Sequence, residues 1–276
     1  MHAHPMKTFR YLATALCIIA VAIAGCQSDR LQRDDNGSEH SAAMADDDSQ
    51  AAPGHAIVLD DNNGNDYAPV INPANFVSAI DNPYFALIPG RAWIYESPDE
   101  DEGYERVKIE VTHEAKIVQG VTTTVVRARE WQDGDLVEDT FDWYAQDNEG
   151  NVWYFGEDSK EIEDGEVIST AGSWEAGVNG AKAGIIMKAN PQVGAAYRQE
   201  YLEGEAEDMG QVIGVGEAIS IRLGSYEDCV LIKDWTPLEP NVVEHKFYCR
   251  AVGNAVLEKK VVGDSGQIEL VEFTAE

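Results

Sequence analysis

The chain has 276 residues and carries 50 acidic against 20 basic side chains, which gives a formal net charge of −30. This balance excludes a nucleic-acid binder with a basic surface, because such proteins need clustered Lys and Arg to displace counterions from phosphates. It also argues against electrostatic adsorption to an anionic membrane, while a hydrophobic content of 44% is enough for a folded core.

The N-terminus carries the features of an export signal. Lys7 and Arg10 form a short basic leader, and residues 11–24 form an almost wholly apolar run. A run of this length is typical of a signal peptide, and it is too short for a transmembrane helix, which needs ~20 residues.

The apolar run ends in Ile23-Ala24-Gly25-Cys26. This motif resembles the lipobox of bacterial lipoproteins, in which the cysteine is lipidated and becomes the mature N-terminus. The resemblance implies a lipoprotein signal peptide over residues 1–25 and lipidation of Cys26. In Gram-negative lipoproteins, a residue other than Asp after the cysteine, such as Gln27 here, resembles the outer-membrane sorting pattern. The alternative is an ordinary cleaved signal with an incidental cysteine.

Residues 26–75 follow as the lipidated cysteine and an acidic tether. They are rich in Ser, Ala, Asp, Asn and Gly and show no periodicity. Such a segment cannot bury enough apolar area to offset its ordering entropy, so we expect it to be disordered. It would hold the folded domain away from the membrane.

Residues 76–276 are expected to form one β domain made of two repeats, at about 85–156 and 189–262. The two stretches match at a fixed offset of 104 residues. The matched positions fall on glycines, aromatics and aliphatics: Gly90 with Gly194, Trp93 with Tyr197, Ile109 with Ile213, Trp131 with Trp235, and Tyr144 with Tyr248. A Gly-rich segment joins the two repeats.

Each repeat is predicted to consist of antiparallel strands. Apolar and polar residues alternate with a period of two, and Gly-containing turns such as Asp133-Gly134-Asp135 separate the runs. The strands expected in the first repeat are 107–117, 121–131, 136–146 and 151–155. The fold class is therefore mainly β and antiparallel: two repeated β-meander units that form a curved sheet, a half-barrel or a sandwich.

Cys229 and Cys249 are expected to form a disulfide. They lie at equal distances from Glu239, near the centre of a predicted hairpin, so they face each other in an antiparallel pair, within disulfide reach. The offset of 104 places Val125 and Ala145 in the equivalent positions of the first repeat. The export signal implies a compartment that permits disulfides. The rival hypothesis is a redox-active pair, but no Cys-x-x-Cys motif supports it.

One face of the two hairpins carries aromatic residues together with cations, which are scarce in this chain. The face is expected to point inward because it is the more apolar one. Its candidate ligand-binding residues are Arg127, Arg129, Trp143, Lys233 and His245. They could line a concave pocket for a small anionic ligand. Alternatively, the cations stack on Trp143 and Phe141 and pair with carboxylates from other strands.

Residues 133–161 form an acidic hairpin that could supply oxygen ligands for Ca²⁺. Its acids are Asp133, Asp135, Glu138, Asp139, Asp142, Asp147, Glu149, Glu157, Asp158 and Glu161. Their spacing matches no calcium loop, and solvated acids on strand edges and turns are the alternative. The Gly-rich segment 172–191 could form a lid across the sheet or a packed surface loop.

No sequence motif of a known enzyme class is present, so the analysis leans towards a protein that is not an enzyme. Residues 85–96 and the stretch Gly150-Asn151-Val152-Trp153-Tyr154-Phe155-Gly156-Glu157 resemble a family of exported bacterial β-rich proteins whose function is uncharacterised. The resemblance implies one secreted β domain and carries no functional residues.

The sequence thus favours an exported protein that is lipid-anchored to a bacterial membrane. This membrane would be the outer one in a Gram-negative cell, with the domain facing the periplasm or the surface. The domain would bind a small anionic ligand or an envelope protein. An extracytoplasmic hydrolase, metal-dependent or carboxylate-based, is one alternative, and a purely structural envelope component is another.

Overall fold

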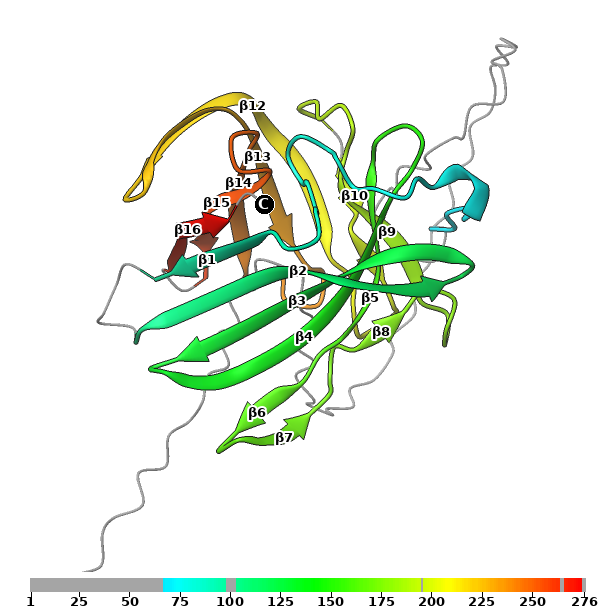
Figure 1. The fold of residues 1–276 in the computed structure, drawn as a ribbon, viewed down its shortest axis with the longest axis horizontal. Coiled ribbons are helices and arrows are strands. Elements are labelled where there is room, and N and C mark those ends of the chain that lie inside the picture. The colour runs from blue at the N-terminus through cyan, green and yellow to red at the C-terminus, as the bar shows by residue number, and fades with distance from the viewer. Residues whose placement is uncertain (1–66, 98–102, 195, 264–265, 275–276) are drawn as a thin grey trace, which may run out of the picture.

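A computed structural model describes residues 67–97, 103–194, 196–263 and 266–274 (Figure 1). The predicted signal peptide, Cys26 and residues 27–66 of the predicted tether lie outside these ranges. The Tyr67 hydroxyl donates a hydrogen bond to the carbonyl oxygen of Ala183 at 2.8 Å. The Asn72 side chain caps the short 3-10 helix η2 (Pro73–Asn75). Among the described residues, Tyr67 and Asn72 already make ordered contacts, although they lie within the stretch assigned above to the tether.

The fold is mainly β, as the sequence predicts, and all its strand pairs are antiparallel. The strands of the first half are β1 (Ala92–Glu96), β2 (Glu105–Val118), β3 (Val121–Gln132), β4 (Asp135–Gln146), β5 (Val152–Asp158), β6 (Glu161–Glu163), β7 (Glu166–Ser169), β8 (Trp174–Glu175) and β9 (Lys182–Met187). Those of the second half are β10 (Tyr197–Arg198), β11 (Glu200–Tyr201), β12 (Met209–Ile221), β13 (Gly224–Trp235), β14 (Val243–Cys249), β15 (Asn254–Val262) and β16 (Gln267–Thr274). No helix among the described residues is long and apolar enough to cross a membrane.

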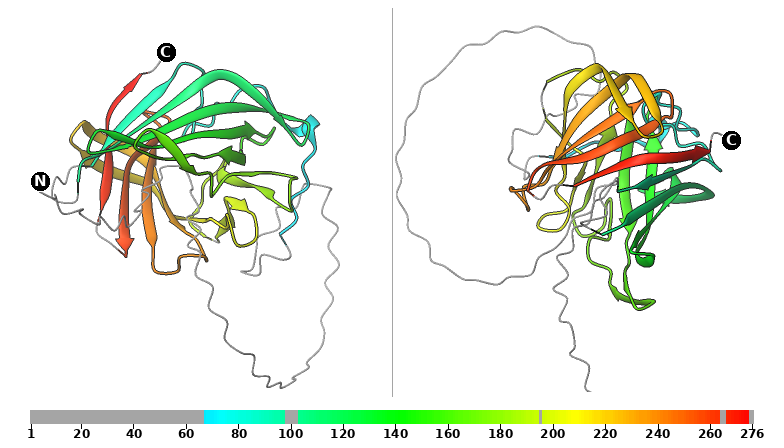
Figure 2. Two further views of the ribbon diagram at one scale, coloured as in Figure 1. Left: turned by 90° about the horizontal axis from the view of Figure 1, so that it is seen from below. Right: turned by 90° about the vertical axis from the view of Figure 1, so that its left-hand side faces the viewer.

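All sixteen strands belong to one sheet, in the order β10-β12-β13-β14-β15-β16-β1-β2-β3-β4-β5-β9-β11, with β6, β7 and β8 attached beside this path. The sheet curls strongly and is not closed into a cylinder (Figure 2). Its two terminal strands, β10 and β11, are neighbours in the chain, so residues 197–201 lie between the two ends of the sheet. The curved sheet thus has a distinct inner and outer face. The internal repeat stays a prediction.

The turn between β3 and β4 shows how local sequence sets the register. Asp133 and Gly134 have φ values of +52° and +94°, and the Asp-Gly pair is the preferred sequence for such a two-residue turn. The connection between β13 and β14 is longer. The first hairpin is consequently offset from the predicted register: Val125 lies opposite Trp143, not opposite Ala145. The prediction for the second hairpin is confirmed, because Cys229 lies opposite Cys249.

The two cysteines form a disulfide, with their Cα atoms 4.2 Å apart. This confirms the pairing that the hairpin centre predicted. The expected equivalence with Val125 and Ala145 is wrong, because the short Asp133–Gly134 turn moves the strand pairing by two residues.

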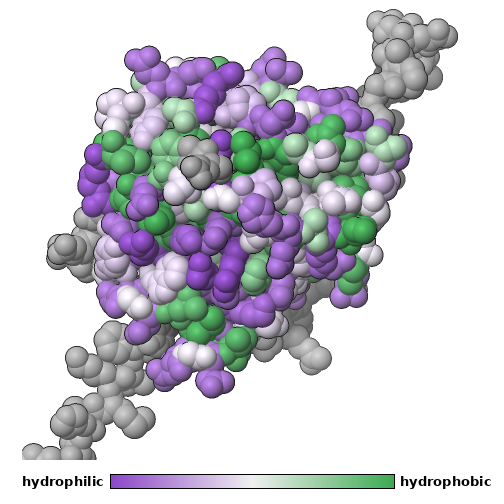
Figure 3. Space-filling view, viewed as in Figure 1, coloured by the Kyte–Doolittle hydropathy of each residue, from purple (hydrophilic) through white to green (hydrophobic). Residues whose placement is uncertain are grey.

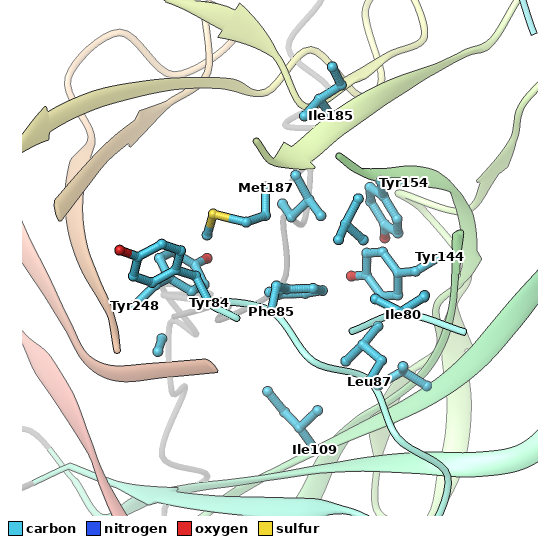
Figure 4. Packing of buried hydrophobic residues seen from close by; sticks show 14 of the residues in the cluster. Ile80, Tyr84, Phe85, Leu87, Ile109, Tyr144, Tyr154, Ile185, Met187 and Tyr248 are labelled. Atoms are coloured by element: carbon cyan, nitrogen blue, oxygen red, sulfur yellow. The ribbon is translucent and has the colours of Figure 1, made fainter. Parts of the chain in front are cut away.

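The apolar core lies inside the curve. Residues 80–87 cross one end of the interior, where Phe85 packs against Tyr144 and Tyr248 with ring centroids 5.4 and 6.1 Å apart. Figure 4 shows Ile80, Phe85 and Leu87 among the side chains of the surrounding strands. This segment is held by backbone contacts such as Ala86 N–H to the carbonyl oxygen of Gly253 at 2.8 Å. One end of the interior is therefore closed by an apolar plug.

Candidate functional site

The predicted anion-binding residues lie on the outer face, so the inward orientation expected for them is wrong. On β3 and β4, the inner positions include Val126 at 1% and Asp142 at 0% exposure, whereas the side chain of Arg127 is 35% exposed. The expectation ranked the two faces by their apolar content. That ranking fails because the outer aromatics are covered by long cationic side chains, while the inner face accepts buried acids.

Each outer cation has a partner of its own. Arg127 makes a bidentate ion pair with Asp139, both contacts being 2.7 Å, and Arg129 lies 3.4 Å from Glu110. Lys233 lies over the ring of Trp235 at 4.5 Å, and His245 is its cross-strand neighbour. Trp143 is covered by the Lys116 ammonium at 3.1 Å from the ring centroid. Arg127 and Arg129 lie on β3 and Lys233 on β13, six strands away in the sheet order. Anion binding by these residues stays a prediction.

The outer face mixes residue types in small areas. Figure 3 shows apolar patches separated by hydrophilic residues on the side drawn in Figure 1.

The acidic hairpin divides between the two faces. Asp139 pairs with Arg127 outside, and Asp147 accepts hydrogen bonds from Asn151 and from the Trp153 indole. Three further acids, Glu138, Asp142 and Glu157, point inward, so these three are not the solvated edge acids of the alternative hypothesis. Asp133, Asp135 and Glu149 are exposed, as that hypothesis expects. Within the described ranges, no group of three or more His, Cys, Asp or Glu residues is arranged to hold a metal ion.

The Gly-rich segment is part of the sheet and is neither a lid nor a loop. Strands β8 and β9 both pair with β5, and Ile185, Ile186 and Met187 of β9 are buried.

The inner face also carries a band of carboxyl groups. We call it the inner acidic band: Glu105, Glu130, Glu138, Asp142, Glu157, Glu200, Asp208, Asp234, Glu244 and Glu258. All of these groups have raised pKa values, chiefly because burial disfavours a charged carboxylate. This band is the candidate functional site.

In the second half of the molecule, a lysine lies at the centre of the band. The Lys246 ammonium is 3.3 Å from Asp234, 3.7 Å from Glu244 and 3.6 Å from Glu258. Burial alone would lower the pKa of Lys246, but the three carboxylates together raise it well above its ordinary value. Lys246 is therefore charged at neutral pH and offsets part of the negative charge around it.

In the first half, Asp142, Glu157 and Glu200 form a trio without such a lysine. Burial raises the pKa of Asp142 to about 8, and the Tyr154 hydroxyl, which donates to its Oδ1 at 2.8 Å, offsets a small part. Burial also raises the pKa of Glu157 well above its ordinary value, with further increments from Asp142 and Glu200. We call these three residues the carboxyl trio. At neutral pH at least part of the trio is protonated.

Close backbone contacts place Glu200 in the trio. Residues 199–200 pass directly over Gly184 of β9. A Cβ atom on residue 184 would lie 2.3 Å from the Gln199 carbonyl. A glycine is required for that approach. Asp142 and Glu157 are cross-strand neighbours on β4 and β5.

Loose contacts act on two of the acids: Tyr154 lowers the pKa of Glu157, and Trp174 and the Asp208 backbone lower that of Glu200. Several polar atoms around the trio nevertheless have no hydrogen bond of good geometry within the described part of the chain. They are both carboxyl oxygens of Glu157, both of Glu200, Oδ2 of Asp142, the Tyr144 hydroxyl and the Trp174 indole nitrogen. Buried polar groups are normally paired, and leaving one unpaired costs about 1–3 kcal/mol. Such a set of groups can bind a ligand that offers donors, or it can transfer protons.

Sequence analysis missed most of the band. Its members come from eight strands and from the segment that precedes β12, so no local motif connects them. One signal was present: on β14, Glu244, Lys246 and Tyr248 occupy alternate positions and therefore share a face. Counting apolar residues on each face hid this pattern.

No protein-family model matches the chain, and no curated protein sequence matches it at a significant level. Membership of the exported β-rich family stays a prediction. A solved structure similar to this chain is that of a Parabacteroides distasonis protein described as a candidate lipoprotein. The two chains are 12% identical, the match covers 69% of this chain and 98% of the other, and the TM-score is 0.36.

Proposed function

We propose that this protein is a lipid-anchored component of a bacterial envelope, non-enzymatic, which binds a small ligand inside its curved β domain. The lipobox-like motif ending at Cys26 supports the anchor, and the described domain begins about 40 residues later. A tether of that length lets the domain work away from the bilayer.

The observation that carries the binding function is the set of buried polar atoms around the carboxyl trio. Glu157 is 1% exposed and Glu200 is 0% exposed, and none of their four carboxyl oxygens accepts a hydrogen bond of good geometry within the described residues. Only looser contacts, from Tyr154 to Glu157 and from Trp174 and the Asp208 backbone to Glu200, lower the pKa values of these two acids. A purely structural domain gains nothing from these groups, because an apolar core of the same shape would be more stable. Binding a complementary ligand is the function that explains their presence best.

Native mass spectrometry of the full chain, extracted from its own membranes in detergent and purified without chelator, tests this proposal. We expect a lipid-modified protein with an additional bound mass, and we expect that mass to be lost in Glu157→Gln. Asp139→Asn is the matched control, because it removes one acid from the outer face of the same hairpin. A lipidated protein without any bound mass would contradict the binding function and favour a structural component. An unmodified Cys26 would contradict the anchor.

A carboxylate-based hydrolase is the second candidate, and the Asp142–Glu157 pair favours it. The two side chains are cross-strand neighbours, and the pKa of Asp142, raised to about 8, keeps it protonated at neutral pH, as a general acid must be. The full chain should then cleave chromogenic glycosides or esters, and Asp142→Asn should abolish turnover.

A further inference from the structure

The part of the inner acidic band in the second half of the molecule shows which kind of charged group this interior can hold. Asp234, Glu244 and Glu258 surround the Lys246 ammonium at 3.3–3.7 Å, and the Lys246 side chain is only 5% exposed. The ammonium group thus fits among three carboxyl groups supplied by different strands of the curved sheet. The interior tolerates a buried positive charge where several carboxylates converge.

The carboxyl trio offers a comparable arrangement without a cation from the chain. Among the described groups that chiefly shift the pKa values of Asp142, Glu157 and Glu200, none is a Lys, Arg or His. The trio comes from β4, β5 and β11, just as the carboxylates around Lys246 come from β13, β14 and β15. An ammonium group has three N–H donors, and neighbouring carboxyl groups from separate strands can accept them.

Aromatic rings stand beside the trio and add a second, independent indication. The Tyr144 hydroxyl is fully buried and has no hydrogen-bond partner among the described residues, and Figure 4 shows it pointing into the interior. Tyr144 and Tyr154 are stacked with centroids 4.8 Å apart, and the Trp174 ring meets Tyr154 edge-on at 5.2 Å. Aromatic rings pack against alkyl chains and attract cations. The Tyr144 hydroxyl oxygen can accept a hydrogen bond from an ammonium group.

The geometry distinguishes an ammonium group from other charged ligands. A metal ion needs oxygen ligands within about 2.0–2.6 Å, and no acidic group of the described chain is arranged in that way. An ammonium group accepts looser contacts, as Lys246 shows. An anion would meet several acidic groups, because Asp142 and Glu200 raise the pKa of Glu157 and Asp142 raises that of Glu200.

We propose that the interior binds a small organic molecule with a primary ammonium group, and that Asp142, Glu157 and Glu200 hold this group as Asp234, Glu244 and Glu258 hold Lys246. This inference rests on the proposed function, since it names the class of ligand for the same site. The ligand must be small because the trio is enclosed, with exposures of 0%, 1% and 0%. Its alkyl part would pack against Tyr144 and Tyr154.

Isothermal titration of the full chain in detergent tests the proposal with four probes. They are 1,5-diaminopentane, the neutral 1,5-pentanediol of the same length, the dianion glutarate, and CaCl₂. We expect the diamine alone to bind, with the release of protons, because an ammonium group lowers the pKa of the carboxyl groups that it contacts. Its affinity should rise with pH between 6 and 8, and titration in buffers of different ionisation enthalpy measures the released protons.

Glu157→Gln should weaken diamine binding at least about tenfold, while Asp139→Asn on the outer face should leave it unchanged. If Glu157→Gln does not fold by circular dichroism, Glu200→Gln makes the same test. Binding of the diol or of Ca²⁺ at least as tight as the diamine, or undiminished diamine binding in both variants, would overturn the ammonium assignment.

Native mass spectrometry separates failure of this inference from failure of the proposed function. A bound neutral or anionic compound that depends on Glu157 would leave the binding function standing and refute the ammonium class. If no compound is found and none of the four probes binds, both are refuted.

Discussion

The two long hairpins, β3–β4 and β13–β14, occupy corresponding places in the two halves of the sheet, but they handle buried charge differently. The second hairpin carries a charged Lys246 among three carboxylates and a disulfide between its strands. The first has Val125 opposite Trp143, and its buried acid, Asp142, lies beside Tyr154 without a lysine. The second hairpin thus supplies a cation for its own acids and a covalent link between its strands. The acids of the first hairpin can instead be protonated or contact a ligand.

This comparison shows that a buried carboxyl group does not by itself mean a buried charge. Around Lys246 burial also raises the pKa values of Asp234, Glu244 and Glu258, but the ammonium lowers all three again in part. In the carboxyl trio, burial and like charge raise the pKa values, so the neutral form is favoured. The two hairpins should therefore respond to mutation and to pH in different ways.

The largest effect is expected from Lys246→Met. This change leaves three carboxyl groups around an apolar side chain and should reduce the free energy of unfolding by about 3–5 kcal/mol at pH 7. Urea denaturation followed by tryptophan fluorescence measures it. Lys233→Met, on the outer face of the neighbouring strand, is the control and should change stability little. A loss below about 1 kcal/mol would show that Lys246 does not balance ionised carboxylates.

Removal of the disulfide should have the next largest effect. The bond closes a loop with a sequence separation of 20 residues, for which the chain-entropy argument gives about 3 kcal/mol. We expect the double variant Cys229→Ala, Cys249→Ala to unfold at correspondingly lower urea concentration, and reduction of the native protein to have a similar effect. Equal stability of the oxidised protein and the double variant would mean that the β13–β14 hairpin is held by its other contacts.

The pH dependence of stability should reveal the carboxyl trio. Asp142 has a pKa of about 8 in the folded protein and about 4 in the unfolded chain, so the unfolded chain loses this proton first. The stabilising contribution is complete below pH 4 and is lost as the pH rises towards 8. Asp142→Asn keeps an acceptor for the Tyr154 hydroxyl but cannot ionise, so it should flatten this slope.

At pH 8 we expect Asp142→Asn to be more stable than the native protein by about 1–3 kcal/mol, and at pH 4 nearly equal to it. Thermal unfolding at a series of pH values makes the comparison. A native protein whose melting temperature does not fall between pH 5 and 8 would contradict the protonated trio.

The sequence predicted the fold well because alternation and turn chemistry act locally. Strands β2 to β5 follow the expected boundaries closely, and the equal spacing of Cys229 and Cys249 from Glu239 fixed their pairing. The register of the first hairpin was predicted wrongly because its turn, Asp133–Gly134, has only two residues and shifts the strand pairing by two positions.

The candidate site could not be predicted in the same way. Period-two alternation separates the faces of a strand, but it does not say which face is inside. Apolar content decides that question only if buried acids are absent, and here Glu130 and Asp142 lie inside while Trp131 and Phe141 lie outside. Glu200 reaches the trio through the crossing over Gly184, a contact between segments that no local pattern encodes.

The smallest effect is expected from Arg127→Leu. This variant tests whether a ligand binds at the outer face or at the inner one. Arg127 and Asp139 form an exposed ion pair, with 35% and 17% of their side chains accessible, so its loss should change stability by less than about 1 kcal/mol. Ligand binding, measured by the same diamine titration, should be unchanged, because Arg127 does not face the interior. If instead this variant loses a bound anion, the outer cations form the ligand site that the sequence suggested. The inner acids would then act on stability alone.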